Sequence, residues 1–226
     1  LAPLLARYPN FELGVNTVFC RGNQERMDDI VDFVAGLKHV RTHTISLVRG
    51  DLADPGHKQV DLDRYERAIA RLAGRARTGA APMYRFRGAR LKAAQDILQR
   101  QLILRTAQAG RRLIPCHAGR LNLVLGETGE VYPCETRTAS LGNVRDYGYD
   151  LRAVMRAAAA RETLGSIGRG ECACTHECYF ITNILFSPRC YPALAAEYRR
   201  LPWPGRAASR VPGGTGRDAP TARTGS

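Results

Sequence analysis

Cysteine is the residue type in this 226-residue chain whose number and spacing most plainly suggest chemistry. Six of the seven cysteines lie in the second half of the chain: Cys116, Cys134, Cys172, Cys174, Cys178 and Cys190. Three of them crowd into the stretch CACTHEC, residues 172–178. Thiols at this density can form disulfides, bind a zinc ion or hold an iron–sulfur cluster.

Disulfides are the least expected of the three. They need an oxidising compartment, and the opening residues LAPLLARYP show neither the basic start nor the long apolar stretch of a signal peptide. Bridges within C-x-C-x3-C would also be strained, because a disulfide requires a particular Cα separation. We therefore expect reduced thiols in a cytoplasmic protein.

Zinc and iron–sulfur clusters are harder to separate by spacing. Structural zinc sites usually pair C-x2-C units, and the sequence has none, although His117 and His176 could serve as nitrogen ligands. Iron–sulfur clusters accept more varied spacings, because several thiolates converge on a larger object. Spacing alone leaves both alternatives open.

The order of the residues around the cysteines is more specific. Cys116, Gly129 and Cys134 are spaced C-x12-G-x4-C, and the stretch LNLVLGETGEVYPC between them predicts a β-hairpin. GNV, a predicted helix over DLRAVMRAAAARETL, the tight cysteine block and one further cysteine follow. This order, from about residue 114 to 192, resembles the SPASM domain, the C-terminal module of many radical S-adenosylmethionine (SAM) enzymes.

The resemblance implies an auxiliary 4Fe-4S cluster. Its expected ligands are Cys116 and Cys134, with two more from Cys172, Cys174 and Cys178, while Cys190 is either a ligand or a buried structural thiol. The later cysteine block of the family is C-x2-C-x5-C-x3-C, whereas this chain has C-x-C-x3-C and one cysteine fewer than the seven that serve two clusters. We therefore expect one cluster rather than two.

The first half of the chain supplies a supporting scaffold. LGVNTVFC (13–20) and THTISLVRG (42–50) are predicted strands, and the helical spacing of apolar residues predicts a helix over QERMDDIVDFVAGLK between them. Strand, helix and strand of these lengths form a βαβ unit with parallel strands. Because parallel sheets are normally covered on both faces, we expect neighbouring strands from sequence preceding Leu1.

This unit resembles the last strands of the partial (β/α)6 barrel of radical SAM enzymes. The resemblance implies that Asn16, in mid-strand, and Arg49, at a strand end, contact S-adenosylmethionine. The alternatives are a strand polar group satisfied locally for Asn16 and a surface ion pair for Arg49. Cys20, at the other strand end, is expected to be a core thiol.

The motif that forms the radical in this family, C-x3-C-x2-C, does not occur in the sequence. The chain is therefore expected to be a fragment of a radical enzyme or a degenerate relative that keeps the auxiliary cluster. For the full-length enzyme the resemblance implies S-adenosylmethionine, a second 4Fe-4S cluster and an electron donor such as flavodoxin or ferredoxin. The substrate, whether peptide, protein or small molecule, is not indicated.

The predicted organisation is an α/β chain in four parts. These are the C-terminal portion of a radical SAM barrel at 1–58, a helical linker at 59–112, a small α+β SPASM-type iron–sulfur domain at 113–201 and a disordered tail at 202–226. The linker is predicted to contain helices over about 61–76 and 88–109, and Gly110 ends the second.

Charge suggests one further alternative. The formal net charge is +13, which favours binding to nucleic acid. Nearly all of it is scattered arginine, however, and no aromatic-rich strand is present on which bases could stack. Nucleic-acid binding thus stays a lesser alternative, beside a zinc-stabilised binding module. No apolar run approaches the roughly 20 residues of a membrane span.

Overall fold

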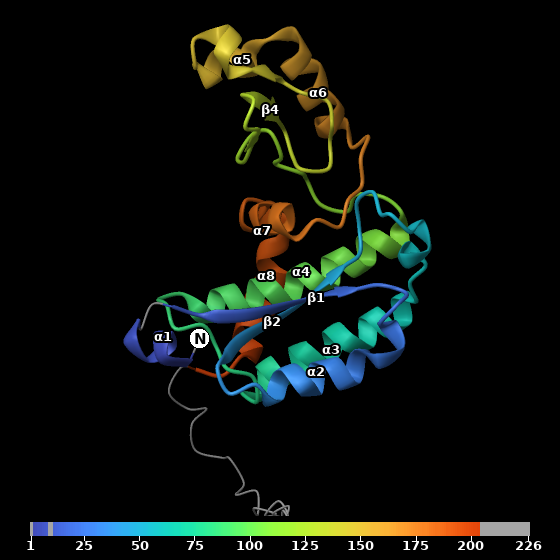
Figure 1. Ribbon diagram of the computed structural model, residues 1–226, viewed down its shortest axis with the longest axis vertical. Coiled ribbons are helices and arrows are strands. Elements are labelled where there is room, and N and C mark those ends of the chain that lie inside the picture. The colour runs from blue at the N-terminus through green and yellow to red at the C-terminus, as the bar shows by residue number, and fades with distance from the viewer. Residues whose placement is uncertain (1, 9–10, 204–226) are drawn as a thin grey trace, which may run out of the picture.

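The computed structural model describes residues 2–8 and 11–203 (Figure 1). Its α-helices are α1 (Ala2–Arg7), α2 (Met27–Gly36), α3 (Leu62–Thr78), α4 (Ala89–Ala109), α5 (Leu151–Arg156), α6 (Ala158–Arg169), α7 (Glu177–Leu185) and α8 (Tyr191–Arg200). Its strands are β1 (Leu13–Phe19), β2 (Val40–Leu47), β3 (Val124–Leu125), β4 (Glu130–Tyr132) and β5 (Gly142–Asn143). Short 3-10 turns are η1 (Gln24–Arg26), η2 (Pro55–Lys58), η3 (Val144–Tyr147) and η4 (Pro188–Cys190). The predicted disordered tail lies outside the described residues from 204 onward.

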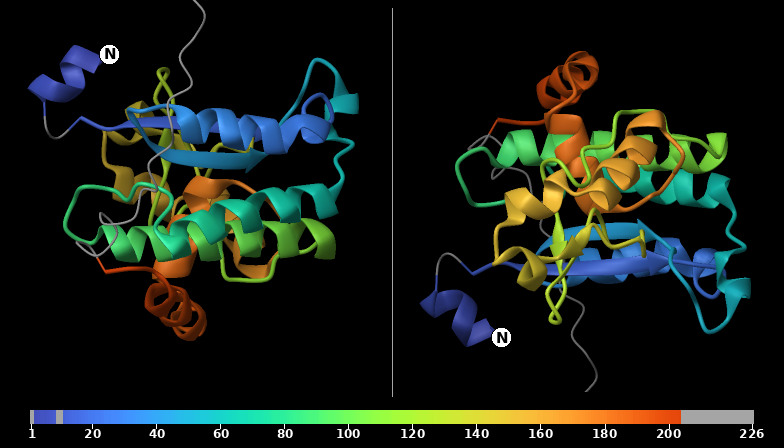
Figure 2. Two further views of the ribbon diagram at one scale, coloured as in Figure 1. Left: turned by 90° about the horizontal axis from the view of Figure 1, so that it is seen from below. Right: turned by 90° about the horizontal axis from the view of Figure 1, so that it is seen from above.

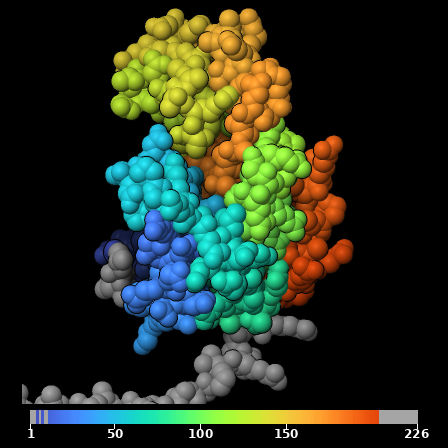
Figure 3. All heavy atoms as spheres, turned by 90° about the vertical axis from the view of Figure 1, so that its right-hand side faces the viewer, coloured from blue at the N-terminus to red at the C-terminus, as the bar shows by residue number. Residues whose placement is uncertain are grey.

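The elements gather in two lobes (Figure 1). The large lobe contains β1, β2, α2, α3, α4, α7 and α8, and the small lobe contains β3, β4, β5, α5 and α6. Helices α7 and α8, which the sequence placed with the small domain, pack on α4 in the large lobe. The side view shows the segment around residues 50–58 directly beneath the small lobe (Figure 3).

The first half folds as the predicted βαβ unit. Strands β1 and β2 pair in parallel, with Thr17 opposite Ile45 and Phe19 opposite Leu47. Alternation along the strands places Phe19, Ile45 and Leu47 in one buried cluster with side chains of α2, α3, α4 and α7. No barrel closes among the described residues, since this sheet has two strands.

The opposite face of the same sheet is open along β1. Gly14, Asn16 and Val18 alternate with the inward residues of β1 and are exposed. A parallel sheet normally has cover on both faces, and the described helices bury one. The uncovered part of this face therefore lies along β1, whereas Ser46 on β2 is buried.

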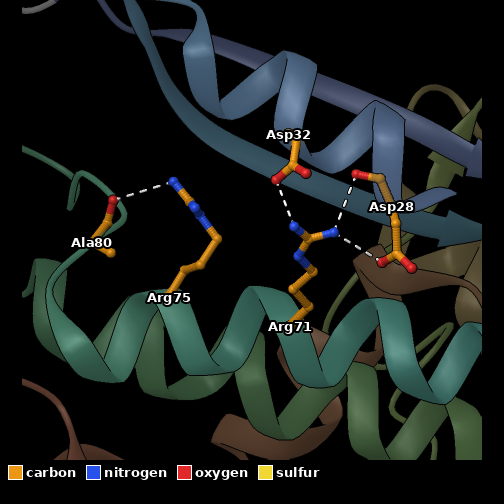
Figure 4. Close-up of polar contacts among 5 residues, drawn as sticks. All are labelled: Asp28, Asp32, Arg71, Arg75 and Ala80. Atoms are coloured by element: carbon orange, nitrogen blue, oxygen red, sulfur yellow. Dashed lines mark hydrogen bonds and ion pairs between the residues drawn. The ribbon is translucent and has the colours of Figure 1, made fainter. Parts of the chain in front are cut away.

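One arginine links helix α3 to helix α2 at the surface (Figure 4). Arg71 donates to the carboxylate of Asp28 at 3.0 Å and to that of Asp32 at 2.6 Å. One turn further on, Arg75 donates to the carbonyl of Ala80 at 3.4 Å. The carboxylates are mostly exposed, so these contacts orient the helices, and the apolar cluster beneath them supplies most of the stability.

The small lobe is built on the predicted hairpin. Strands β3 and β4 are antiparallel, and β5 adds to the far edge of β4. The predicted helix over 150–164 is two helices, because Ala157 is extended (φ −61°, ψ 155°) between α5 and α6. The break lets Val154 and Ala160 both reach the small core around Val131.

Gly119 gives a test of the small lobe. Its φ is +76°, and a Cβ there would overlap Leu164 Cδ2 and lie 3.1 Å from Pro133 Cβ. We expect Gly119→Ala to lower the free energy of unfolding by about 1–3 kcal/mol, because both the backbone and the packing resist a side chain. Gly74 in α3 is the matched control: nothing lies within 4 Å, and Gly74→Ala should raise stability by up to about 1 kcal/mol. Urea unfolding measures both, and equal effects would contradict the expectation.

None of the helices within the described residues combines the length and apolar character that crossing a membrane requires.

Candidate metal centre

Four of the six predicted cysteine ligands line one pocket. Cys116, Cys134, Cys172 and Cys174 all border a cavity of about 850 Å³ at the junction of the two lobes. Cys116 follows α4, Cys134 follows β4, and the other two lie in the loop between α6 and α7. Three loops that are distant in sequence therefore bring their thiols to the same place.

Apolar packing brings two of these loops together. Cys116 and Cys134 pack with Ala118 and with Tyr179, a buried residue of α7. Burial raises the pKa of Tyr179 to about 12, so its hydroxyl stays protonated at neutral pH. The aromatic ring thus forms a neutral wall beside the two thiols.

Helix α7 also fixes the loops by hydrogen bonds. Asn183 accepts from the backbone N–H of His117 at 2.8 Å, and the Tyr179 hydroxyl accepts from the backbone N–H of Glu135 at 3.2 Å. The buried ring of His176, just before α7, contacts the Glu135 carboxylate through Nε2. Each cysteine-bearing loop is therefore tied to the same helix, which sets the relative positions of the thiols.

Burial and positive charge act in opposite directions on the thiols. Burial raises the pKa of Cys172, and the positive charges of Arg137 and Arg112 oppose the increase. Burial likewise raises the pKa of Cys174, and the backbone N–H of His176 opposes it. Cys172 and Cys174 are accordingly protonated at neutral pH until a metal displaces their protons, so acid would disfavour metal loading.

The four thiols line the pocket without forming a preformed metal site. In the part of the chain that the structure describes, no three His, Cys, Asp or Glu side chains are grouped closely enough to hold a metal ion. Zinc draws its four ligands to a single atom, whereas each thiolate of a 4Fe-4S cluster binds a different iron. The four thiols that line this cavity are compatible with either arrangement.

The two other predicted cysteine ligands lie elsewhere. Cys178 is exposed on the first turn of α7 and does not line the pocket. Cys190 is buried in an apolar cluster with Ile97, Ile184 and Leu194, and burial alone raises its pKa. Its surroundings are those of a structural core thiol, one of the two roles expected for it.

Arg49 and Asn16 are placed differently. Arg49 lines the cysteine pocket, and its Nη1 lies 2.6 Å from the carboxylate of Glu177 at the start of α7. Asn16 accepts from the Ser46 hydroxyl at 2.8 Å on the open face of the sheet and does not line the pocket. Asn16 therefore has the local partner that its alternative interpretation required, whereas Arg49 pairs with a buried carboxylate rather than at the surface. Of the two, only Arg49 lines the pocket.

Several residues of the site were not predicted from the sequence. Arg112, Arg137 and Tyr179 surround the thiols, and Lys58 adds a further positive charge to the pocket lining. The nearness of Arg137 to Cys134 in the sequence is a weak signal. Arg112 carries a similar weak signal, since it lies four residues before Cys116, and it reaches the site by donating to the carbonyls of Ile167 and Gly168.

Comparison with known proteins does not assign the chain to a family. No family model matches the chain, and no curated protein or solved structure matches it either. The functional argument therefore depends on the residues and their arrangement.

Proposed function

We propose that the chain is an iron–sulfur protein that holds one auxiliary 4Fe-4S cluster, as the C-terminal part of a radical SAM enzyme with a SPASM-type domain. The observation that carries the proposal is the pocket lined by Cys116, Cys134, Cys172 and Cys174. These four would supply the thiolate ligands. These cysteines occur along the chain in the same order, around a hairpin, as the cysteines of a SPASM domain.

The position of the pocket supports the proposal. Arg49, Gly50 and Asp51 line it immediately after the carboxyl end of β2. Barrels of parallel strands place their chemistry at this end of the strands. A cluster in the pocket would therefore lie beside the edge at which a substrate of the complete enzyme would bind.

A cluster bound here supplies one-electron transfer. The residues of the chain determine how that group is held: Arg112 and Arg137 stabilise negative charge at Cys172, and Tyr179 shields Cys116 and Cys134. Such surroundings tune the reduction potential of iron–sulfur clusters through charge, hydrogen bonds and burial. Cys20 is the only cysteine before Cys116, so we do not expect this chain alone to cleave S-adenosylmethionine.

The proposal is tested by measuring iron, acid-labile sulfide and zinc per chain after anaerobic purification and reconstitution. We expect about four irons and four sulfides, with the broad brown absorption of thiolate-bound iron. About eight irons would show that the remaining thiols support a second cluster. Stoichiometric zinc without sulfide would refute the cluster and identify a zinc-stabilised module instead.

A further inference from the structure

A second large cavity lies away from the cysteines, where the loop between α3 and α4 meets α8. Its volume is about 1480 Å³, and its lining comes from residues 79–91, from α8 and from the chain just after α8. In both views of Figure 2 the loop and α8 lie next to the start of α4. We call this cavity the aromatic groove.

The aromatic groove exposes apolar side chains that a monomeric surface normally hides. Phe86 is 52% exposed and Trp203 is 62% exposed, and Leu91 and Tyr191 are also exposed. Contiguous apolar patches of this kind on soluble proteins mark binding sites. The groove therefore has the character of a contact surface rather than of ordinary loop packing.

Positive charge is concentrated at the same place. Arg85, Arg87 and Arg90 line the groove, and no Asp or Glu is among its described lining residues. Nearby acidic side chains are already engaged: Glu12 with the backbone N–H of Arg85, Asp96 with Tyr84 and Lys92, and Glu197 with Arg77 and Arg200. A ligand in the groove thus meets arginines whose charge is not balanced by the groove itself.

The three arginines have different roles. Arg90 is buried, lies 4.2 Å from the ring centroids of both Tyr198 and Trp203, and donates to the Leu201 carbonyl at 2.8 Å. It is therefore part of the groove wall and holds Trp203 in place. Arg85 and Arg87 are exposed and can contact a ligand directly.

We propose that the aromatic groove binds an acidic segment of a partner protein that carries apolar side chains between its carboxylates. Exposed rings and aliphatic side chains would accept the apolar residues, and Arg85 and Arg87 would pair with the carboxylates. The proposal is independent of the cluster.

Two other occupants fit less well. The C-terminal residues 204–226 follow Trp203, but they contain four arginines and one aspartate, so their charge matches that of the groove instead of complementing it. Single-stranded nucleic acid needs free aromatic faces for its bases. Arg90 lies over the rings of Tyr198 and Trp203, which leaves Phe86 and Tyr191 as the aromatic side chains without such a cover, and Leu91 and Leu194 add aliphatic lining that suits apolar side chains of a peptide.

The groove contains its own reporter, because Trp203 is the only tryptophan of the chain. The full chain would be titrated with the synthetic peptide EEDFLEELDE, with the charge-reversed peptide KKRFLKKLKR, and with a single-stranded thymidine oligonucleotide. We expect the acidic peptide alone to shift the Trp203 emission saturably, with an affinity that falls as salt is added.

Variants make the test specific to the groove. The double change Arg85→Glu with Arg87→Glu should weaken binding of the acidic peptide by about tenfold or more. The matched control, Arg105→Glu with Arg152→Glu, reverses two exposed charges on α4 and α5 outside the groove and should leave the affinity unchanged. The proposal would be overturned if both double variants lost affinity for the acidic peptide equally. It would also be overturned if the chain bound the charge-reversed peptide, or bound the oligonucleotide in place of the acidic peptide. So would an unchanged emission spectrum with every probe.

Discussion

The Cys134→Ala variant is expected to lose most of its iron and sulfide after anaerobic reconstitution. Cys134 is one of the four thiols of the pocket, and it is buried against Cys116 and Tyr179. Removal of the Cys134 thiolate leaves three protein ligands for a cluster of four irons. No other cysteine occupies the buried position of Cys134, so none replaces the lost ligand. Iron and sulfide analysis with the visible spectrum measures the loss directly.

The matched control is Cys190→Ala. Cys190 is as well buried as Cys134, but its neighbours are apolar side chains of α4, α7 and α8. This variant should keep its full iron content and lose only a small amount of stability, because one sulfur is removed from a packed core. Retention of iron by Cys134→Ala, or its loss from Cys190→Ala, would contradict the assignment of ligands.

The second large effect is expected in the core of the large lobe. Ile103 of α4 is fully buried in the cluster that contains Phe19, Ile45 and Tyr65. We expect Ile103→Ala to lower the free energy of unfolding by about 3 kcal/mol, because the lost transfer energy adds to the cost of the cavity. Chemical denaturation monitored by circular dichroism measures the change.

Phe33→Ala on α2 is the control for this effect. The Phe33 side chain is larger than that of Ile103, but it is 70% exposed and belongs to none of the buried clusters. Its removal should change stability by no more than about 0.5 kcal/mol. A larger effect at Phe33 than at Ile103 would mean that the open surface of α2 is covered by another element or a partner.

The two lobes differ in the size of their apolar cores. The large lobe has an extensive apolar core, whereas the core of the small lobe centres on five buried residues: Val131, Leu141, Val144, Val154 and Ala160. A small core supplies little free energy, and metal binding can supply the remainder. The proposed cluster would therefore stabilise the small lobe as well as transfer electrons.

Local patterns in the sequence predicted much of the secondary structure. The βαβ unit, the hairpin over 121–134 and the helices over about 61–76 and 88–109 all form, since each depends on the periodicity and turn residues of a short segment. The break at Ala157 was not predicted. An alanine carries no local signal for an extended backbone, and the break accompanies the burial of both Val154 and Ala160 in one core.

The sequence also supplied the set of candidate ligands, but it did not select among them. Cys178 and Tyr179 are adjacent on α7, and successive residues of a helix point about 100° apart. One therefore faces solvent while the other packs against Cys134. Which of the two faces the pocket depends on how α7 is rotated against α4, and that is decided by long-range packing.

The chain by itself determined the cysteine-rich character of its second half and the order in which its thiols occur. Tertiary structure alone decided that Cys116, Cys134, Cys172 and Cys174 share one pocket and that Cys190 belongs to a core. It also brought Phe86 and Trp203 to one groove. The physical reason is the same in each case: the partners are far apart along the chain, and they meet only because burying the apolar faces of α4, α7 and α8 fixes the loops between them.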